Sequence, residues 1–98
     1  MNSKIFYCSR QRAMHLAQEV LREMKLRKEN VDTGSSTILA SRGWNFLSSS
    51  KEIEITMFVD ENRVEVAVDV QPRMKALDFG TSEYIEEDFL LRMRDRLN

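Results

Sequence analysis

The feature that most constrains the fold is the stretch from Lys51 to Gln71, where apolar and polar residues alternate on both sides of a short polar turn. Alternation with a period of two places every second side chain on the same face of a β-strand, so this stretch predicts a hairpin with one buried face. A two-residue turn at Glu61 and Asn62 sets each inward residue opposite another apolar residue. The inward pairs are then Val59 with Val64, Met57 with Val66, Ile55 with Val68, and Ile53 with Val70.

The same register defines the outward side of the hairpin. It sets Phe58 opposite Glu65 and Glu54 opposite Asp69. Carboxylates that face each other directly across two strands are unfavourable. The pair of Glu54 and Asp69 is therefore a local conflict that the hairpin itself does not explain.

Two amphipathic segments are available to cover the apolar side of the hairpin. Residues 10–24 repeat apolar side chains at three- and four-residue steps, and Ser9 offers an N-cap hydroxyl. Residues 83–97 carry a stripe at four-residue spacing, and Thr81 or Ser82 is the expected N-cap. In residues 83–97 the acids lie in the first turns and the arginines in the last, which suits the helix dipole. The acids are Glu83, Glu86 and Glu87, and the arginines are Arg92, Arg94 and Arg96.

The remaining segments complete the predicted sheet. Residues 4–8 are expected to form a short strand that runs into the first helix, and residues 26–32 and 37–41 a hairpin whose first arm is a weak edge strand. We therefore predict one α+β domain over residues 1–98. Its architecture is a two-layer sandwich in the order β-α-β-β-β-β-α, with an antiparallel sheet of four or five strands and both helices on one face.

Composition excludes several classes of protein. The chain has 15 Lys and Arg against 16 Asp and Glu, so it has no global attraction for nucleic acid or for an anionic membrane. A single cysteine allows no internal disulfide, and no apolar run has the length of a membrane span. We expect a cytoplasmic protein with no membrane contact and no cofactor.

The leading functional hypothesis is a non-catalytic interaction module. Aromatic side chains supply a large contact area, and Trp44 and Phe46 lie beside a serine-rich loop while Phe58 points outward from its strand. Glu54 and Asp69, on the same outward side, would select a basic partner. We expect this surface to dock another protein or a second copy of the chain.

A small-ligand carrier is the alternative from another class. Six methionines in 98 residues are many, and flexible thioethers suit an adaptable pocket between the helices and the sheet. The same methionines also suit ordinary core packing. The pocket of a carrier would be lined by Met14, Met24, Met57, Met74 and Met93.

Other chemistry is suggested by single residues. Glu52, Glu54 and Asp69 have the ligand type for a divalent cation in a metal-dependent enzyme, but they equally suit a solvated sheet face. Outward aromatics would suit stacking on nucleic-acid bases, but the acids beside them would repel phosphates. Cys8 precedes a helix N-terminus, where a thiol can become reactive, although a cysteine in a strand-like segment is more often simply buried. His15 is expected to be an ordinary surface histidine.

The segment before the last helix resembles a known pattern. Asp78, Phe79 and Gly80 form an Asp-aromatic-Gly turn, and Ile85 follows as an inward residue of the helix. In this respect the chain resembles small bacterial α+β domains to which no activity is assigned. The resemblance implies a bacterial origin and the α+β fold, with Asp78, Phe79 and Gly80 as a structural turn in which Gly80 takes a positive φ.

Overall fold

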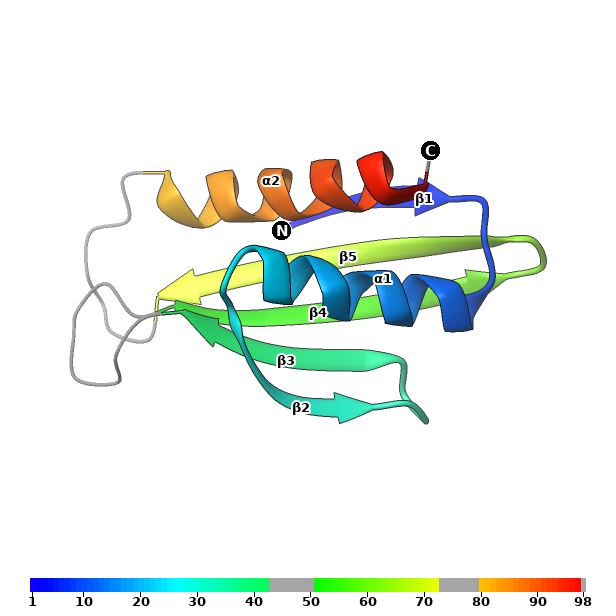
Figure 1. Cartoon of the computed structure of the whole chain (residues 1–98), viewed down its shortest axis with the longest axis horizontal. Coiled ribbons are helices and arrows are strands. Elements are labelled where there is room, and N and C mark those ends of the chain that lie inside the picture. Colours follow the sequence, from blue (N-terminus) through cyan, green and yellow to red (C-terminus); the bar gives the residue numbers. More distant parts are fainter. Residues whose placement is uncertain (43–50, 73–79, 98) are drawn as a thin grey trace.

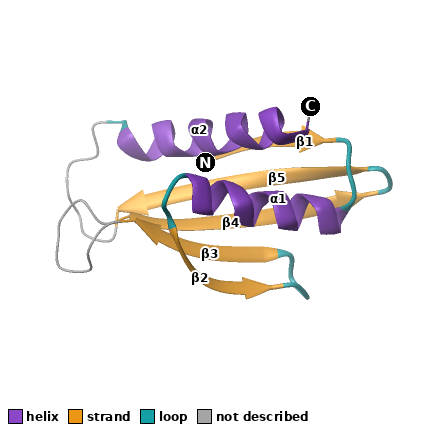
Figure 2. Ribbon diagram, viewed as in Figure 1, coloured by secondary structure: helices purple, strands orange, loops and turns teal. Residues whose placement is uncertain are grey.

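The structure is a computed structural model, and the residues that it describes are 1–42, 51–72 and 80–97. Within them the elements follow one another in the predicted order, β-α-β-β-β-β-α (Figures 1 and 2). The elements are β1 (Asn2–Phe6), α1 (Arg10–Glu23), β2 (Arg27–Asp32), β3 (Thr37–Arg42), β4 (Lys51–Asp60), β5 (Arg63–Pro72) and α2 (Thr81–Leu97).

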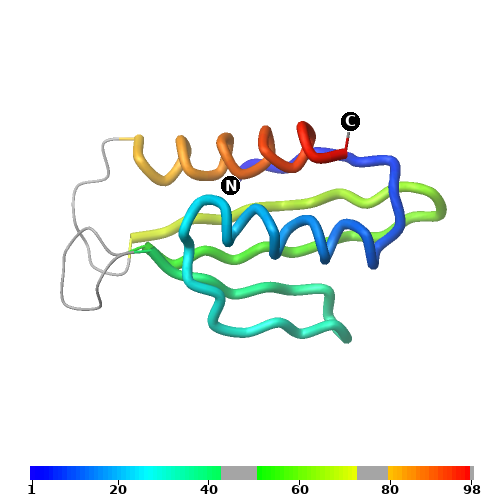
Figure 3. The backbone as a smooth tube through the Cα atoms, in the orientation of Figure 1, coloured from blue at the N-terminus to red at the C-terminus, as the bar shows by residue number. Residues whose placement is uncertain are grey.

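All five strands join one antiparallel sheet in the order β1-β5-β4-β3-β2. The first strand lies beside the last one, and α1 carries the chain across the sheet from β1 to β2 at the opposite edge (Figure 3). β2 is the predicted edge strand, and its register shifts between Lys28 and Asn30. β1 lies two residues earlier than predicted, because the chain leaves the sheet after Phe6 and bends toward Ser9. The Ser9 hydroxyl caps α1 by accepting a hydrogen bond from Arg12 N–H.

The register of the central hairpin is the predicted one. Each of the four inward pairs is found, and the outward pairs of Phe58 with Glu65 and Glu54 with Asp69 are found as well. Asp60 lies opposite Arg63 across the two-residue turn. A slip by one residue would have moved every inward side chain to the outer side, which is why the alternation fixes the register so firmly.

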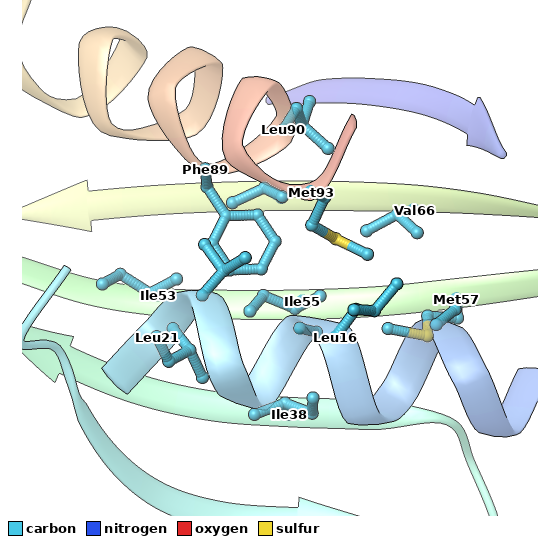
Figure 4. Close-up of a cluster of buried hydrophobic side chains, with 14 of the residues drawn as sticks. Leu16, Leu21, Ile38, Ile53, Ile55, Met57, Val66, Phe89, Leu90 and Met93 are labelled. Atoms are coloured by element: carbon cyan, nitrogen blue, oxygen red, sulfur yellow. The ribbon is translucent and has the colours of Figure 1, made fainter. Parts of the chain in front are cut away.

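Both helices pack on the same face of the sheet, as predicted. Figure 4 shows Leu16 and Leu21 of α1 beside Phe89 and Met93 of α2, all directed toward the inward side chains of the strands. The strand residues in this cluster are those at the predicted inward positions, among them Ile53, Ile55, Met57 and Val66, with Ile38 from β3. The hairpin's apolar side and both helix stripes therefore share one core.

α2 begins two residues earlier than its apolar stripe indicates. The helix starts at Thr81, so Thr81 and Ser82 lie inside it and neither is its N-cap. The residue before the helix is Gly80, whose carbonyl accepts the hydrogen bond of Tyr84 N–H at 3.0 Å. Gly80 has a φ of +83°, so its predicted positive φ is confirmed. Gly80 thus leads directly into the helix.

Partly exposed charged side chains join the two helices to each other. Glu23 of α1 accepts hydrogen bonds from Arg92 and Arg96 of α2, and the two bonds from Arg96 measure 2.6 and 3.0 Å. Arg96 also contacts Glu19 at 2.7 Å. The hydrogen bonds from Arg96 and then Arg92 lower the pKa of Glu23 below its usual value. These residues form a helix clamp between α1 and α2.

The helix clamp predicts how stability depends on pH. A carboxyl whose pKa is lower in the folded than in the unfolded protein stabilises the fold above the unfolded pKa, about 4.3 for Glu, and this contribution is lost as the pH falls through the folded value. We expect the free energy of unfolding to decrease on acidification below about pH 5. The free energy of unfolding of Glu23→Gln should decrease less steeply with falling pH. Glu87→Gln, at an exposed position of α2, should show the same dependence on pH as the wild type. Urea denaturation across this range measures the slopes, and equal slopes for Glu23→Gln and wild type would contradict the clamp.

Candidate functional site

The candidate site is the side of the sheet turned away from α1 and α2, which we call the outer face. Along β4 the inward residues from Lys51 to Met57 are buried while Glu52, Glu54 and Phe58 are exposed, and only the inward Val59 at the end of the strand is exposed as well. No described element packs against this side. The inner face is already covered by the core. The exposed side chains of the outer face are therefore the candidates for binding a partner.

One end of the outer face is apolar. Ile5 of β1 lies opposite Glu65 of β5, which in turn lies opposite Phe58 of β4. Phe58 is 57% exposed and Ile5 is 45% exposed. With Val59 they line a shallow hollow of about 150 Å³, which Asp60, Arg63 and Glu65 also line. We call the exposed pair of Phe58 and Ile5, with Glu65 between them, the apolar end.

The other end of the outer face is acidic. Glu54 and Asp69 face each other across β4 and β5 and line a hollow of about 240 Å³ with Glu52 and with Glu29 of β2. Leu39 of β3 lies opposite Glu54 and lines the same hollow. We call this the acidic end. Four carboxylates line it, so the electrostatic potential there is negative and favours a positively charged ligand.

The two ends are held at a fixed distance by the sheet. Glu54 and Phe58 are four residues apart on β4 and project from the same side, which places them about 13 Å apart at the usual rise of a strand. β4 is a central strand, paired along its length with β5 and over Lys51–Thr56 with β3. The arrangement therefore belongs to the most firmly paired part of the sheet.

The structure places some of the predicted site residues together and leaves others undescribed. Phe58, Glu54 and Asp69 lie on the outer face at the register predicted for them. Gly80 directly precedes α2 and does not lie on this face. The other predicted site residues lie outside the described part of the chain: Trp44 and Phe46 of the serine-rich segment, and Asp78 and Phe79 of the turn.

Three residues of the outer face were missed by the reasoning from sequence. Ile5 joins Phe58 only because β1 pairs with β5, a contact between distant parts of the chain. Leu39 follows from the pairing of β3 with β4, which local patterns do not specify. Glu29 reaches the acidic hollow at the irregularity of β2, where the register shifts. Alternation within β3 was the one signal available, since it makes Leu39 outward if Ile38 is inward.

The remaining candidate residues have ordinary surroundings. Burial raises the pKa of the Cys8 thiol, with the nearby Arg12 opposing it, so this residue lacks the lowered pKa of a reactive cysteine. His15 is exposed and its Nε2 lies 2.7 Å from Glu19 Oε1. Among the methionines named for a carrier, Met74 lies outside the described residues and Met24 is partly buried beside the core. The others, Met14, Met57 and Met93, are buried in the core.

In residues 1–42, 51–72 and 80–97, no three His, Cys, Asp or Glu side chains are placed to hold a metal ion. No described helix is long and apolar enough to cross a membrane.

The chain was also compared with known proteins. No protein-family model matches it, and no curated protein matches it significantly. The resemblance to small bacterial α+β domains therefore stays a prediction.

Proposed function

We propose that the protein is a non-catalytic interaction module that docks another protein on the outer face of its sheet. The observation that supports this most is the apolar end, where Phe58 and Ile5 are exposed on a sheet whose other side already has a complete core. Large apolar side chains gathered on a surface are unusual unless something covers them. Their removal from water would supply the binding energy.

The charge of the outer face favours a different protein over a second copy of the chain. Two copies packed face to face would bury the four carboxylates of the acidic end against each other or against the apolar end. Both arrangements are costly, because like charges repel each other and a carboxylate covered by apolar side chains loses its hydration. We expect a monomer in light scattering at all concentrations. A dimer that Phe58→Ala dissociates would instead mean that the outer face binds a second copy.

The docking proposal is tested by selection from a displayed library of random peptides that is unbiased in charge. We expect selected peptides to lose affinity for Phe58→Ala by about tenfold or more, because a central aromatic residue carries a large share of the binding energy. Affinities are measured by titration calorimetry with the individual peptides.

Tyr84→Ala is the matched control, since Tyr84 is an exposed aromatic residue on α2. This variant should bind the peptides like the wild type. Thermal denaturation followed by circular dichroism checks that both variants remain folded. Peptides that bind Phe58→Ala and wild type equally well would contradict the proposal.

A further inference from the structure

The pairing of the central strands limits what kind of segment can lie on the outer face. β4 pairs with β5 along its length and with β3 over Lys51–Thr56, and β5 also pairs with β1 over Val64–Val68, so most of their backbone groups are engaged within the sheet. A segment that lies on this face meets side chains only and gains no strand pairing, so its own backbone N–H and C=O groups must be paired within the segment wherever it covers the face and excludes water. An α-helix meets this condition, whereas an isolated extended segment does not.

The acidic end indicates the charge of that helix. Glu54 and Asp69 repel each other across the strands, and within the described part of the chain the Asp69 side chain accepts a hydrogen bond from the neutral amide of Gln71, at 3.1 Å. A Lys or Arg side chain set between the two carboxylates converts this repulsion into attraction. The conflict in the free protein is therefore relieved by a basic ligand.

The spacing of the two ends sets the layout of the ligand. A separation of about 13 Å corresponds to roughly nine residues of an α-helix, or between two and three turns. A helix is about 10 to 12 Å wide with its side chains, which is close to two strand spacings. One helix can thus lie along β4 and β5 and contact both ends.

We propose that the partner element is a basic amphipathic helix of another protein. Its apolar residue packs on Phe58 and Ile5, and its Lys or Arg side chains, between two and three turns further along, lie between Glu54 and Asp69. This inference rests on the proposed function and names the class of partner.

The experiment uses the peptides whose binding depends on Phe58. We expect them to be rich in Lys and Arg and to gain helical signal in circular dichroism on binding. Glu54→Lys should weaken their binding by about tenfold, because it removes one partner of a charge pair and adds a repulsive charge. Glu87→Lys, on α2, makes the same change in net charge and should leave binding unchanged. Glu54→Lys should not lower the melting temperature, since it replaces a like-charge pair with an opposite-charge pair.

The other outcomes separate this inference from the proposed function. Phe58-dependent peptides that are neutral or acidic, or that bind Glu54→Lys as tightly as the wild type, overturn the basic helix and leave the docking surface intact. Basic peptides that tolerate a proline in their middle overturn the helical conformation, because proline breaks a helix interior. A selection in which no peptide depends on Phe58 overturns the proposed function itself.

Discussion

Phe89→Ala is expected to lower the free energy of unfolding by about 3 to 5 kcal/mol, the usual cost of truncating a fully buried phenylalanine. Phe89 is 0% exposed and lies between the two helices and the sheet (Figure 4). Removing its ring deletes contacts with both layers and leaves a cavity that the rigid strands cannot close. Urea denaturation followed by circular dichroism measures the change.

Phe58→Ala is the control for this truncation. It removes the same ring, but from the exposed end of the outer face, so we expect a change within about 0.5 kcal/mol. Should Phe89→Ala prove too unstable to titrate, Phe89→Leu provides a smaller cavity and a measurable loss. Equal losses for Phe58→Ala and Phe89→Ala would contradict the assignment of inner and outer faces.

The exposure of Phe58 and the burial of Phe89 were predictable, because each follows from a local pattern in the sequence. Phe58 falls at an outward position of a strand whose inward residues from Ile53 to Val59 are apolar, and Phe89 falls on the four-residue stripe of α2. Such patterns fix which side of an element is buried, since no other side offers enough apolar surface. The hairpin register and the two-layer architecture follow from the same argument.

The neighbours of each strand were less predictable. The apolar end exists because β1 pairs with β5 and brings Ile5 into the row of Phe58. That pairing joins residues more than 55 positions apart, and no periodicity within either strand encodes it. The acidic end similarly needs Glu29, which an irregular edge strand contributes. The chemistry of the site was thus visible in the hairpin, but its full composition depends on tertiary contacts.

Glu86 illustrates a misleading local signal. As an acid in an early turn of α2 it was interpreted as a contribution to the helix dipole, but its side chain is buried and the residue is only 3% exposed. Its Oε2 accepts the hydrogen bond of Val70 N–H at 2.8 Å, and its Oε1 that of Asn2 Nδ2 at 2.8 Å. β1 pairs with β5 only as far as Val68, so the Val70 amide lies beyond the end of the neighbouring strand. The carboxylate of Glu86 takes the place of that missing strand.

Glu86→Ala is therefore expected to lower the free energy of unfolding by about 1 to 3 kcal/mol, the cost of leaving a buried polar group without its partner. Glu86→Gln should lose less, because the amide oxygen can still accept from Val70 N–H. Glu87→Ala, one residue further along α2 and exposed, should change stability by no more than about 0.5 kcal/mol. Urea denaturation of the three variants gives the ranking.

Hydrogen exchange at the Val70 amide separates the loss of this hydrogen bond from a general loss of stability. In Glu86→Ala the Val70 amide should exchange faster by a larger factor than the amides of Val66 and Val68, which lie opposite β1 residues in the sheet. Uniform acceleration across β5 would mean that Glu86 acts only through the packing of α2. A selective effect would show that a helix side chain completes the hydrogen bonding of a strand where β1 ends.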